Sequence, residues 1–308
     1  MMHIINSSRR IKGGIQIVIT GASGLLAQAL LYTLKDRYKV NTYTHSQLDI
    51  TNQEQVFSKL SRNKIDIIIN AAACANVDYC ENNPEIAYSI NQAGPRNLAL
   101  YCKEHKIKLI HFGTDYLFND TAGKHYFKEN DTLAPHSVYA CTKLAGEQEI
   151  IRIGPDFLII RVSWLFGPFK NNFVTWLIAT LRSGKPAHVV CDQVSAPTYT
   201  IDTARAMIKL IEKNSSAIVH LRNNNECSRM QQAEYIAETA CLDTKLLVPL
   251  PGHAIYQKAQ RPHFSVMDIS LLEQILGEKM RTWQETTEEF LNFSLNNDIT
   301  TRHGFNKS

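Results

Sequence analysis

Residues 15–27 read IQIVITGASGLLA, which has the pattern of a strand, a glycine turn and the start of a helix. The first six residues are rich in β-branched side chains, as is typical of a buried parallel strand, and an apolar helix follows to about Lys35. Gly21 permits a tight turn, Gly24 lets the backbone approach a pyrophosphate on the helix N-terminal amides, and the small Ala27 allows close helix–strand packing. The spacing is Gly-x-x-Gly-x-x-Ala, so an ordinary strand–turn–helix is the alternative. The place of this glycine turn, directly after the first strand and before a helix, favours a dinucleotide site.

The alternation of strand and helix continues along the first half of the chain. Apolar runs predict four further strands, with helices between them, at residues 39–44, 65–69, 108–112 and 157–162. This alternation predicts an α/β fold, a Rossmann-type doubly wound parallel sheet with right-handed crossovers. We expect a disordered extension at 1–14, an NAD(P)-binding domain at 15–167, and a smaller α/β substrate lobe at 168–308. Some elements of that lobe are expected to pack back on the first domain.

Several side chains receive structural roles from their positions. Asp49 or Thr51 is expected to cap the helix that follows, and Asp202 is expected to cap a helix in the second half. Trp176 and Leu177 lie in an apolar helical stretch and are expected to belong to the core rather than to contact a cofactor.

Residues at the ends of the second and third strands bear on the cofactor. The second strand ends in Thr44-His45-Ser46, with neither an acid nor an arginine to select the ribose, so NAD and NADP both remain open. Asp49 fits either a helix cap or an adenine contact. The third strand ends in Asn70-Ala71-Ala72-Ala73, and such small side chains leave room for a ligand at the carboxyl edge of the sheet. Close packing alone would also explain these alanines.

A second motif, Tyr139-Ala140-Cys141-Thr142-Lys143, supplies candidate chemistry. A Tyr and a Lys four residues apart share one helix face, so the ammonium of Lys143 is expected to lower the pKa of Tyr139 toward neutrality. Such a phenol can give a proton to a carbonyl oxygen. The pattern also arises by chance on solvated helix faces. Thr114 and Tyr116 follow the fourth strand, where a hydroxyl is placed to hold a substrate carbonyl.

Composition narrows the classes of partner and compartment. The 308 residues carry a net charge of +4 with no Lys/Arg cluster, so we expect no nucleic-acid partner. The seven cysteines lack zinc-site spacing and are interpreted as reduced thiols of a cytoplasmic protein. No apolar run is long enough to span a bilayer, so we expect no membrane partner.

The order of these motifs resembles that of the extended short-chain dehydrogenase/reductases, and most closely their dTDP-4-dehydrorhamnose reductase branch. The resemblance covers about residues 15–290 and includes five further stretches: Val77-Asp78-Tyr79-Cys80-Glu81, Thr114-Asp115-Tyr116-Leu117-Phe118, residues 161–167, Asp192-Gln193 with Ala196-Pro197-Thr198, and Arg261-Pro262 with Ser265 and Asp268. It implies an NADPH- or NADH-dependent reduction of the C4 ketone of a dTDP-linked 4-keto-6-deoxy sugar.

The resemblance also implies roles for single residues. Tyr139 would be the proton donor, Lys143 would bind the nicotinamide ribose, and Thr114 would hydrogen-bond the substrate oxygen. The remaining roles fall into two sets: cofactor contacts at Gly21, Gly24, Leu25, Leu26, Asp49, Ile50, Ala71, Ala72 and Ala73, and sugar contacts at Val77, Tyr116 and Trp164. A homodimer is compatible with the resemblance, and we expect no metal.

Four positions depart from the branch. Gly113 stands where Ser is common, Ala75 where Thr is common, Asn76 where Ala is usual, and Cys141 where Gly or Ser is frequent. Most of these lie near the cofactor or sugar, so the identity of the substrate stays open.

Three alternatives to the dTDP-4-dehydrorhamnose reductase role remain. Another nucleotide-sugar 4-ketoreductase or an epimerase of the same fold would use the same motifs. The regulatory subunit of methionine adenosyltransferase resembles the same branch and acts by binding a partner. The presence of Thr114, Tyr139 and Lys143 together favours an enzyme.

Overall fold

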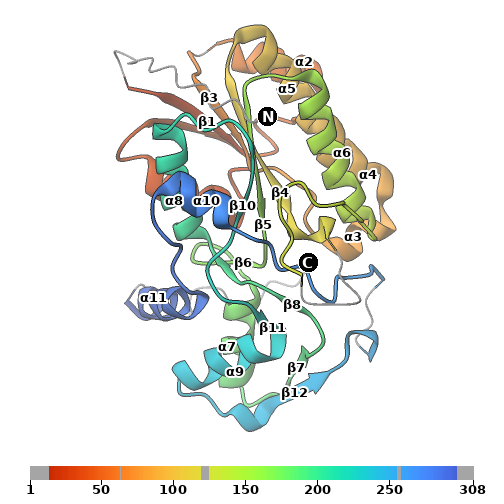
Figure 1. The fold of residues 1–308 in the computed structure, drawn as a ribbon, viewed down its shortest axis with the longest axis vertical. Helices are drawn as coiled ribbons and strands as arrows, with labels where there is room; N and C mark the ends of the chain where they lie inside the picture. The colour runs from red at the N-terminus through yellow and green to blue at the C-terminus, as the bar shows by residue number, and fades with distance from the viewer. Residues whose placement is uncertain (1–13, 63, 119–124, 255–257, 297–308) are drawn as a thin grey trace.

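A computed structural model describes residues 14–62, 64–118, 125–254 and 258–296. Nearly all of the predicted extension at 1–14 therefore lies outside the described residues. The centre of the fold is a six-stranded sheet, shown in the upper part of Figure 1, in the order β10-β5-β4-β3-β1-β2. All of its pairings are parallel. The strands are β1 (Gln16–Thr20), β2 (Lys39–Tyr43), β3 (Ile67–Asn70), β4 (Lys108–Thr114), β5 (Phe157–Val162) and β10 (Ile218–Leu221).

Alternate side chains of β1 enter two separate cores, because successive residues of a strand point to opposite faces of a sheet. Ile17 and Ile19 enter the core beneath α1 (Leu25–Leu34), α8 (Thr200–Glu212) and α10 (Ser270–Leu276). These helices form one outer layer, in which α1 packs against α8.

Val18 enters the opposite core, which is covered by a second layer of helices. This layer is made of α2 (Gln53–Leu60), α5 (Gly94–His105) and α6 (Val138–Ile153). A nearly continuous helical stretch precedes β4, in which α4 (Pro84–Tyr88) is joined to α5 through a π-helical segment at Ser89–Ala93. The two helical layers lie on opposite sides of the sheet in Figure 1. The predicted α/β, doubly wound parallel fold is confirmed.

A smaller lobe lies below the sheet in Figure 1 and has a third core. Its helices are α7 (Phe173–Arg182), α9 (Arg229–Thr239) and α11 (Trp283–Asn296), and its strands form two-stranded pairs: β6 (Leu165–Phe166) with β9 (Thr198–Tyr199), β7 (Ala187–Val190) with β12 (Leu247–Leu250), and β8 (Val194–Ser195) with β11 (Cys227–Ser228). Other short elements are α3 (Val77–Asn82) and the 3₁₀ turns Asp115–Leu117, Thr244–Leu246 and Gly252–Ala254. Although α8 and β10 follow residue 167, both pack with the central sheet.

Three local predictions are wrong. Asn52, rather than Asp49 or Thr51, caps α2 by accepting a hydrogen bond from the Gln55 amide at 2.9 Å. Asp202 lies inside the first turn of α8 and binds Arg281 at 2.5 Å, so it stabilises a tertiary contact instead of a helix end. Leu177 is fully buried as expected, but Trp176 is 39% exposed.

Candidate active site

The glycine turn joins β1 to α1 and packs directly against the end of β3. Gly21 has a φ of +70°, and a Cβ there would lie 2.6 Å from the backbone of Ala72. Only glycine combines this left-handed conformation with so close an approach. The Gly24 amide donates to the Gly21 carbonyl at 2.8 Å, which closes the turn.

The N-terminus of α1 fits the pyrophosphate of a dinucleotide. Gly24 is the N-cap, it offers no side-chain acceptor, and no acidic residue lies in the first turn. The first-turn amides, including those of Leu25 and Leu26, therefore lack the side-chain cap that satisfies such donors in most helices. Lys170 extends from the smaller lobe and places its ammonium 3.4 Å from the Ser23 carbonyl. Free amides, the helix dipole and this cation together favour an anion at the turn.

The predicted adenine contacts, Asp49 and Ile50, lie in the connection between β2 and α2. Asp49 accepts hydrogen bonds from the Thr51 amide at 2.9 Å and the Thr51 hydroxyl at 2.8 Å. Ile50 is buried, and Asn97 donates to its carbonyl at 3.0 Å. The His45 side chain is 80% exposed and lies 3.9 Å from the Asp49 carboxylate, so its imidazole is accessible from solvent.

A buried chain of polar groups crosses the carboxyl edge of the sheet toward Lys143. Asn70 accepts from the Thr20 hydroxyl at 2.7 Å, and its amide nitrogen lies 3.0 Å from Nδ1 of His111. The other ring nitrogen of His111 lies 3.3 Å from Nζ of Lys143, which also donates to the Phe112 carbonyl at 2.6 Å. Burial lowers the pKa of Lys143 to about 8, although the Glu147 charge opposes this.

Tyr139 comes together with Thr114 and Tyr116 at the end of β4. The rings of Tyr116 and Tyr139 meet edge to face with centroids 5.7 Å apart. Burial raises the pKa of Tyr139 well above its ordinary value, while a hydrogen bond with Thr114 acts in the opposite direction. Because Lys143 binds Phe112 and His111 instead of the phenol, the prediction that it lowers the pKa of Tyr139 is wrong for this structure.

Asp115 is a buried group of the site to which the sequence analysis gave no role. Its carboxylate accepts from the hydroxyls of Ser265 at 2.6 Å and Ser195 at 2.9 Å, so it ties the end of β4 to two segments that are distant in the chain. Burial raises its pKa to about 6, and the serine hydrogen bonds counteract part of that shift. The sequence signal that could have identified Asp115 was its position, directly after an apolar strand and between Thr114 and Tyr116.

Two of the four departures have a structural reason. A Cβ at Gly113 would lie 2.2 Å from Oε1 of Glu147, whose carboxylate is paired with Arg161 at 2.8 Å in the interior. Asn76 caps α3 by accepting from the Tyr79 amide at 3.0 Å. Nothing in the structure explains Ala75 in place of Thr.

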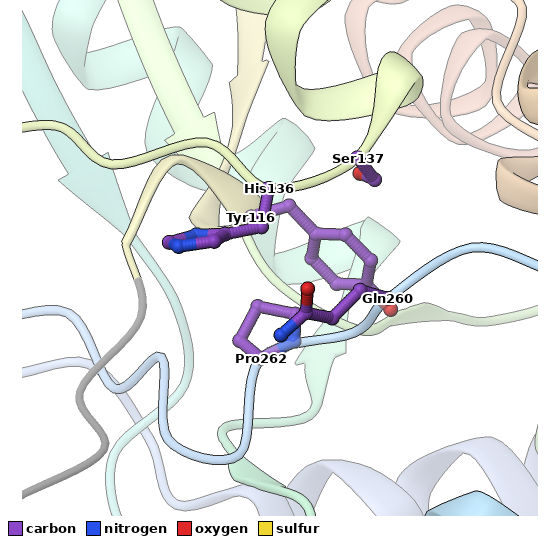
Figure 2. Close-up of a pocket in the computed structure, with 5 residues that line it drawn as sticks. All are labelled: Tyr116, His136, Ser137, Gln260 and Pro262. Atoms are coloured by element: carbon purple, nitrogen blue, oxygen red, sulfur yellow. The ribbon is translucent and has the colours of Figure 1, made fainter.

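The predicted sugar contacts come from three elements. Val77 begins α3, whose next residue, Asp78, pairs with Arg261 at 2.7 Å. Tyr116 lines a small hollow with His136, Ser137, Gln260 and Pro262, which Figure 2 shows grouped around its ring. Trp164 lies between β5 and β6 with a φ of +36°, a strained conformation for an aromatic residue.

The chain is similar to known proteins along most of its length. Residues 15–295 match the family described as the RmlD substrate binding domain. The chain belongs to this family. The predicted resemblance is thereby confirmed.

Relatives in the RmlD family cover nearly the whole chain. A dTDP-4-dehydrorhamnose reductase of Aggregatibacter actinomycetemcomitans is 33% identical over 283 residues, 87% of this chain and 96% of its own. The spore coat polysaccharide biosynthesis protein SpsK of Bacillus subtilis is 34% identical over 277 residues, 90% of this chain and 96% of its own. A crystal structure of Bacillus anthracis dTDP-4-dehydrorhamnose reductase with NADP is 31% identical, has a TM-score of 0.87, and covers 91% of this chain and 100% of its own.

Among residues 14–62, 64–118, 125–254 and 258–296, no group of three or more His, Cys, Asp or Glu side chains is arranged to hold a metal ion. Nor does any helix within those residues have the length and apolar character needed to cross a membrane.

Proposed function

We propose that this RmlD-family protein reduces the C4 ketone of dTDP-4-dehydro-6-deoxy-L-mannose to give dTDP-L-rhamnose, using NADPH or NADH. The observation that carries the proposal is the convergence of Tyr139, Thr114 and Lys143 at the carboxyl end of β4, one strand away from the end of β3 against which the glycine turn packs. In an open parallel sheet this edge is where ligands bind. The named reductases among the relatives support the choice of substrate.

Tyr139 is the proton donor in this proposal. Its raised pKa keeps the phenol protonated at neutral pH, so it has a proton to give to the C4 oxygen as negative charge develops there. Thr114, which hydrogen-bonds with Tyr139, holds the same oxygen in place. Two hydroxyl groups aimed at one oxygen orient the carbonyl and stabilise its charge.

The cofactor is held along the carboxyl edge. NADPH or NADH, when bound, supplies the hydride that reduces the carbon. The first-turn amides of α1 hold its pyrophosphate, Lys143 holds the nicotinamide ribose, and Asp49 and Ile50 flank the adenine. The cofactor is lined by Ala71, Ala72 and Ala73. The first two of these alanines also pack closely against the backbone of Gly21.

The wider assignments follow from the same proposal. The sugar is contacted by Val77, Tyr116 and Trp164. Residues 15–167 form the cofactor domain and residues 168–308 form the substrate lobe. Two elements after residue 167 belong with the cofactor domain: β10 extends its sheet and α8 covers it. We place the enzyme in the cytoplasm, in keeping with its free cysteines, and regard a homodimer as its candidate assembly.

The test is oxidation of NADPH, and separately NADH, in the presence of dTDP-4-dehydro-6-deoxy-L-mannose, with product stereochemistry determined by NMR. Formation of dTDP-L-rhamnose by the wild type supports the assignment and ranks the cofactors. Absence of oxidation by a protein that binds cofactor in calorimetry refutes it. A product epimeric at C4 identifies a reductase of opposite stereochemistry.

A further inference from the structure

Arg229 begins α9 in the smaller lobe and contacts the predicted sugar residue Trp164. Its guanidinium carbon lies 3.4 Å from the centroid of the Trp164 ring and 4.7 Å from that of Phe173. A planar guanidinium at this distance stacks on the indole and restricts its motion. Arg229 therefore holds Trp164 in the strained backbone conformation described above.

Arg229 has no carboxylate partner in direct contact within the described residues, although the charge of the nearby Asp115 acts on its pKa. Among those residues its side chain makes one hydrogen bond, from Nη1 to Oε1 of Gln232 at 2.7 Å. Burial lowers its pKa to about 10, so it stays charged at neutral pH. A guanidinium has five N–H donors, so most of them lack a protein acceptor here.

Helix stability does not account for this cation. Arg229 occupies the first turn of α9, where the helix dipole disfavours positive charge, and that turn contains no acidic residue. The Ser228–Gln231 capping box already satisfies the helix N-terminus. A half-buried cation in an unfavourable position with spare donors is expected where an anionic ligand binds.

Arg229 lies close to the residues that follow β4, where the proposed proton donor and Thr114 are located. Its charge acts on the pKa values of both Tyr116 and Asp115, which are neighbours of Thr114 in the chain. Its amide donates to the carbonyl of Gln193 at 3.1 Å, two residues before Ser195, whose hydroxyl binds Asp115. Arg229 thus lies on the smaller lobe's side of the site, next to the residues assigned to the sugar.

We propose that Arg229 binds the diphosphate of the nucleotide sugar and at the same time clamps Trp164 against the sugar. The inference rests on the proposed function, because the diphosphate is the group bonded directly to the sugar that Tyr139 and Trp164 contact. The fork of guanidinium donors matches two phosphate oxygens, and a lysine ammonium does not reproduce that geometry.

The probe is thymidine diphosphate, titrated calorimetrically into the NADP⁺-loaded full-length protein. The variants are Arg229→Gln, which removes the charge, and Arg229→Lys, which keeps the charge without the planar fork. Arg37→Gln is the matched control, since Arg37 pairs with Glu212 on the surface and its side chain is 60% exposed. We expect Arg229→Gln to bind thymidine diphosphate on the order of 10–100-fold more weakly, with Arg229→Lys intermediate and Arg37→Gln unchanged.

Salt dependence separates ligand binding from a purely structural role. Wild-type affinity should fall as ionic strength rises, and the fall should be shallower in Arg229→Gln, whereas affinity for NADPH should be the same in both. Equal thymidine diphosphate affinity and equal salt slopes in wild type and Arg229→Gln overturn the inference. Loss of NADPH binding together with thymidine diphosphate binding in both Arg229 variants also overturns it, because the residue then acts on the whole fold.

The inference and the proposed function fail in different ways. If the wild type binds thymidine diphosphate through Arg229 but does not reduce the keto-sugar, the diphosphate site stands and the proposed substrate is wrong. If the wild type reduces the keto-sugar with a KM that Arg229→Gln leaves unchanged, the function stands and the diphosphate site is wrong.

Discussion

The interior leaves little room for a side chain at Gly113, and a serine there should destabilise the protein. A Cβ would lie 2.2 Å from Oε1 of Glu147 and 2.9 Å from Cγ of Arg161. Both of these side chains are almost completely buried, with exposed fractions of 0% and 2%. Arg161 donates to Oε2 of Glu147 from Nη2 at 2.8 Å and from Nε at 3.1 Å, so the carboxylate cannot move aside without losing hydrogen bonds.

The magnitude follows from two costs. Forcing extra atoms into a packed interior destabilises by about 1–3 kcal/mol. If the carboxylate is displaced far enough to leave Arg161 uncompensated, the loss approaches the roughly 3–5 kcal/mol of a broken buried ion pair. We therefore expect Gly113→Ser to lower the free energy of unfolding by at least about 1 kcal/mol, with a larger loss if the pair separates.

Urea unfolding followed by circular dichroism measures this effect through the midpoint and slope of the transition. Gly14→Ser is the matched control, because a Cβ at Gly14 meets nothing within 4 Å. Glu147→Ala alone should also destabilise, since it strands Arg161, and the double variant Gly113→Ser/Glu147→Ala should lose at least ~1 kcal/mol less than the sum of the two. A Gly113→Ser protein as stable as the Gly14→Ser control, or strictly additive losses, would refute the argument.

Three other changes test the site itself. Tyr139→Phe should lower kcat by about 10²–10⁴-fold while leaving NADPH affinity in a fluorescence titration unchanged; wild-type turnover would remove Tyr139 from its role. Gly21→Ala should weaken NADPH binding and destabilise by at least ~1 kcal/mol, because it strains a φ of +70° and collides with Ala72; unchanged binding would contradict the packing of the turn. Burial raises the pKa of Asp115 from its ordinary 3.8 to about 6, so its stabilising contribution is complete below pH 4 and is lost as the pH rises through 6. The unfolding free energy of wild type relative to Asp115→Asn should therefore fall by up to ~3 kcal/mol between pH 4 and pH 7, and a difference independent of pH would show that the carboxyl titrates normally.

The sheet was predictable because each of its first five strands can be recognised from the residue types within that strand alone. Each buried parallel strand is a short apolar run, and parallel pairing brings the carboxyl ends to one edge, so Thr114 and the alanines after β3 could be placed there without coordinates. The sequence predicted that some elements after residue 167 pack back on the first domain, but no local pattern identifies β10 as the strand that joins the sheet.

Contacts between distant segments were not predictable. Asp202 fits a helix cap by its position, but Arg281, 79 residues away, determines its actual role. Asp115 is likewise defined by Ser265, 150 residues away. The choice of Asn52 over Asp49 as the cap of α2 is a smaller case. The two residues are three positions apart and have similar cap propensity, so only the backbone geometry that each adopts decides between them.

The Tyr139 result changes what the Tyr-x-x-x-Lys spacing means for catalysis. The spacing predicts a phenol acidified by its lysine, yet burial raises the pKa of Tyr139, and Lys143 binds the Phe112 carbonyl and His111. A general acid must be protonated before it reacts, and burial ensures that, but it also makes the proton harder to release. Thr114 is the neighbour whose hydrogen bond lowers this pKa, so under the proposed function the threonine on β4 would both position the carbonyl and ease the transfer. Under the proposed function, the chain's own contribution to proton transfer would reside mainly in the Thr114–Tyr139 pair. Lys143, which is linked through His111 and Asn70 to the strand ends, would hold the cofactor ribose.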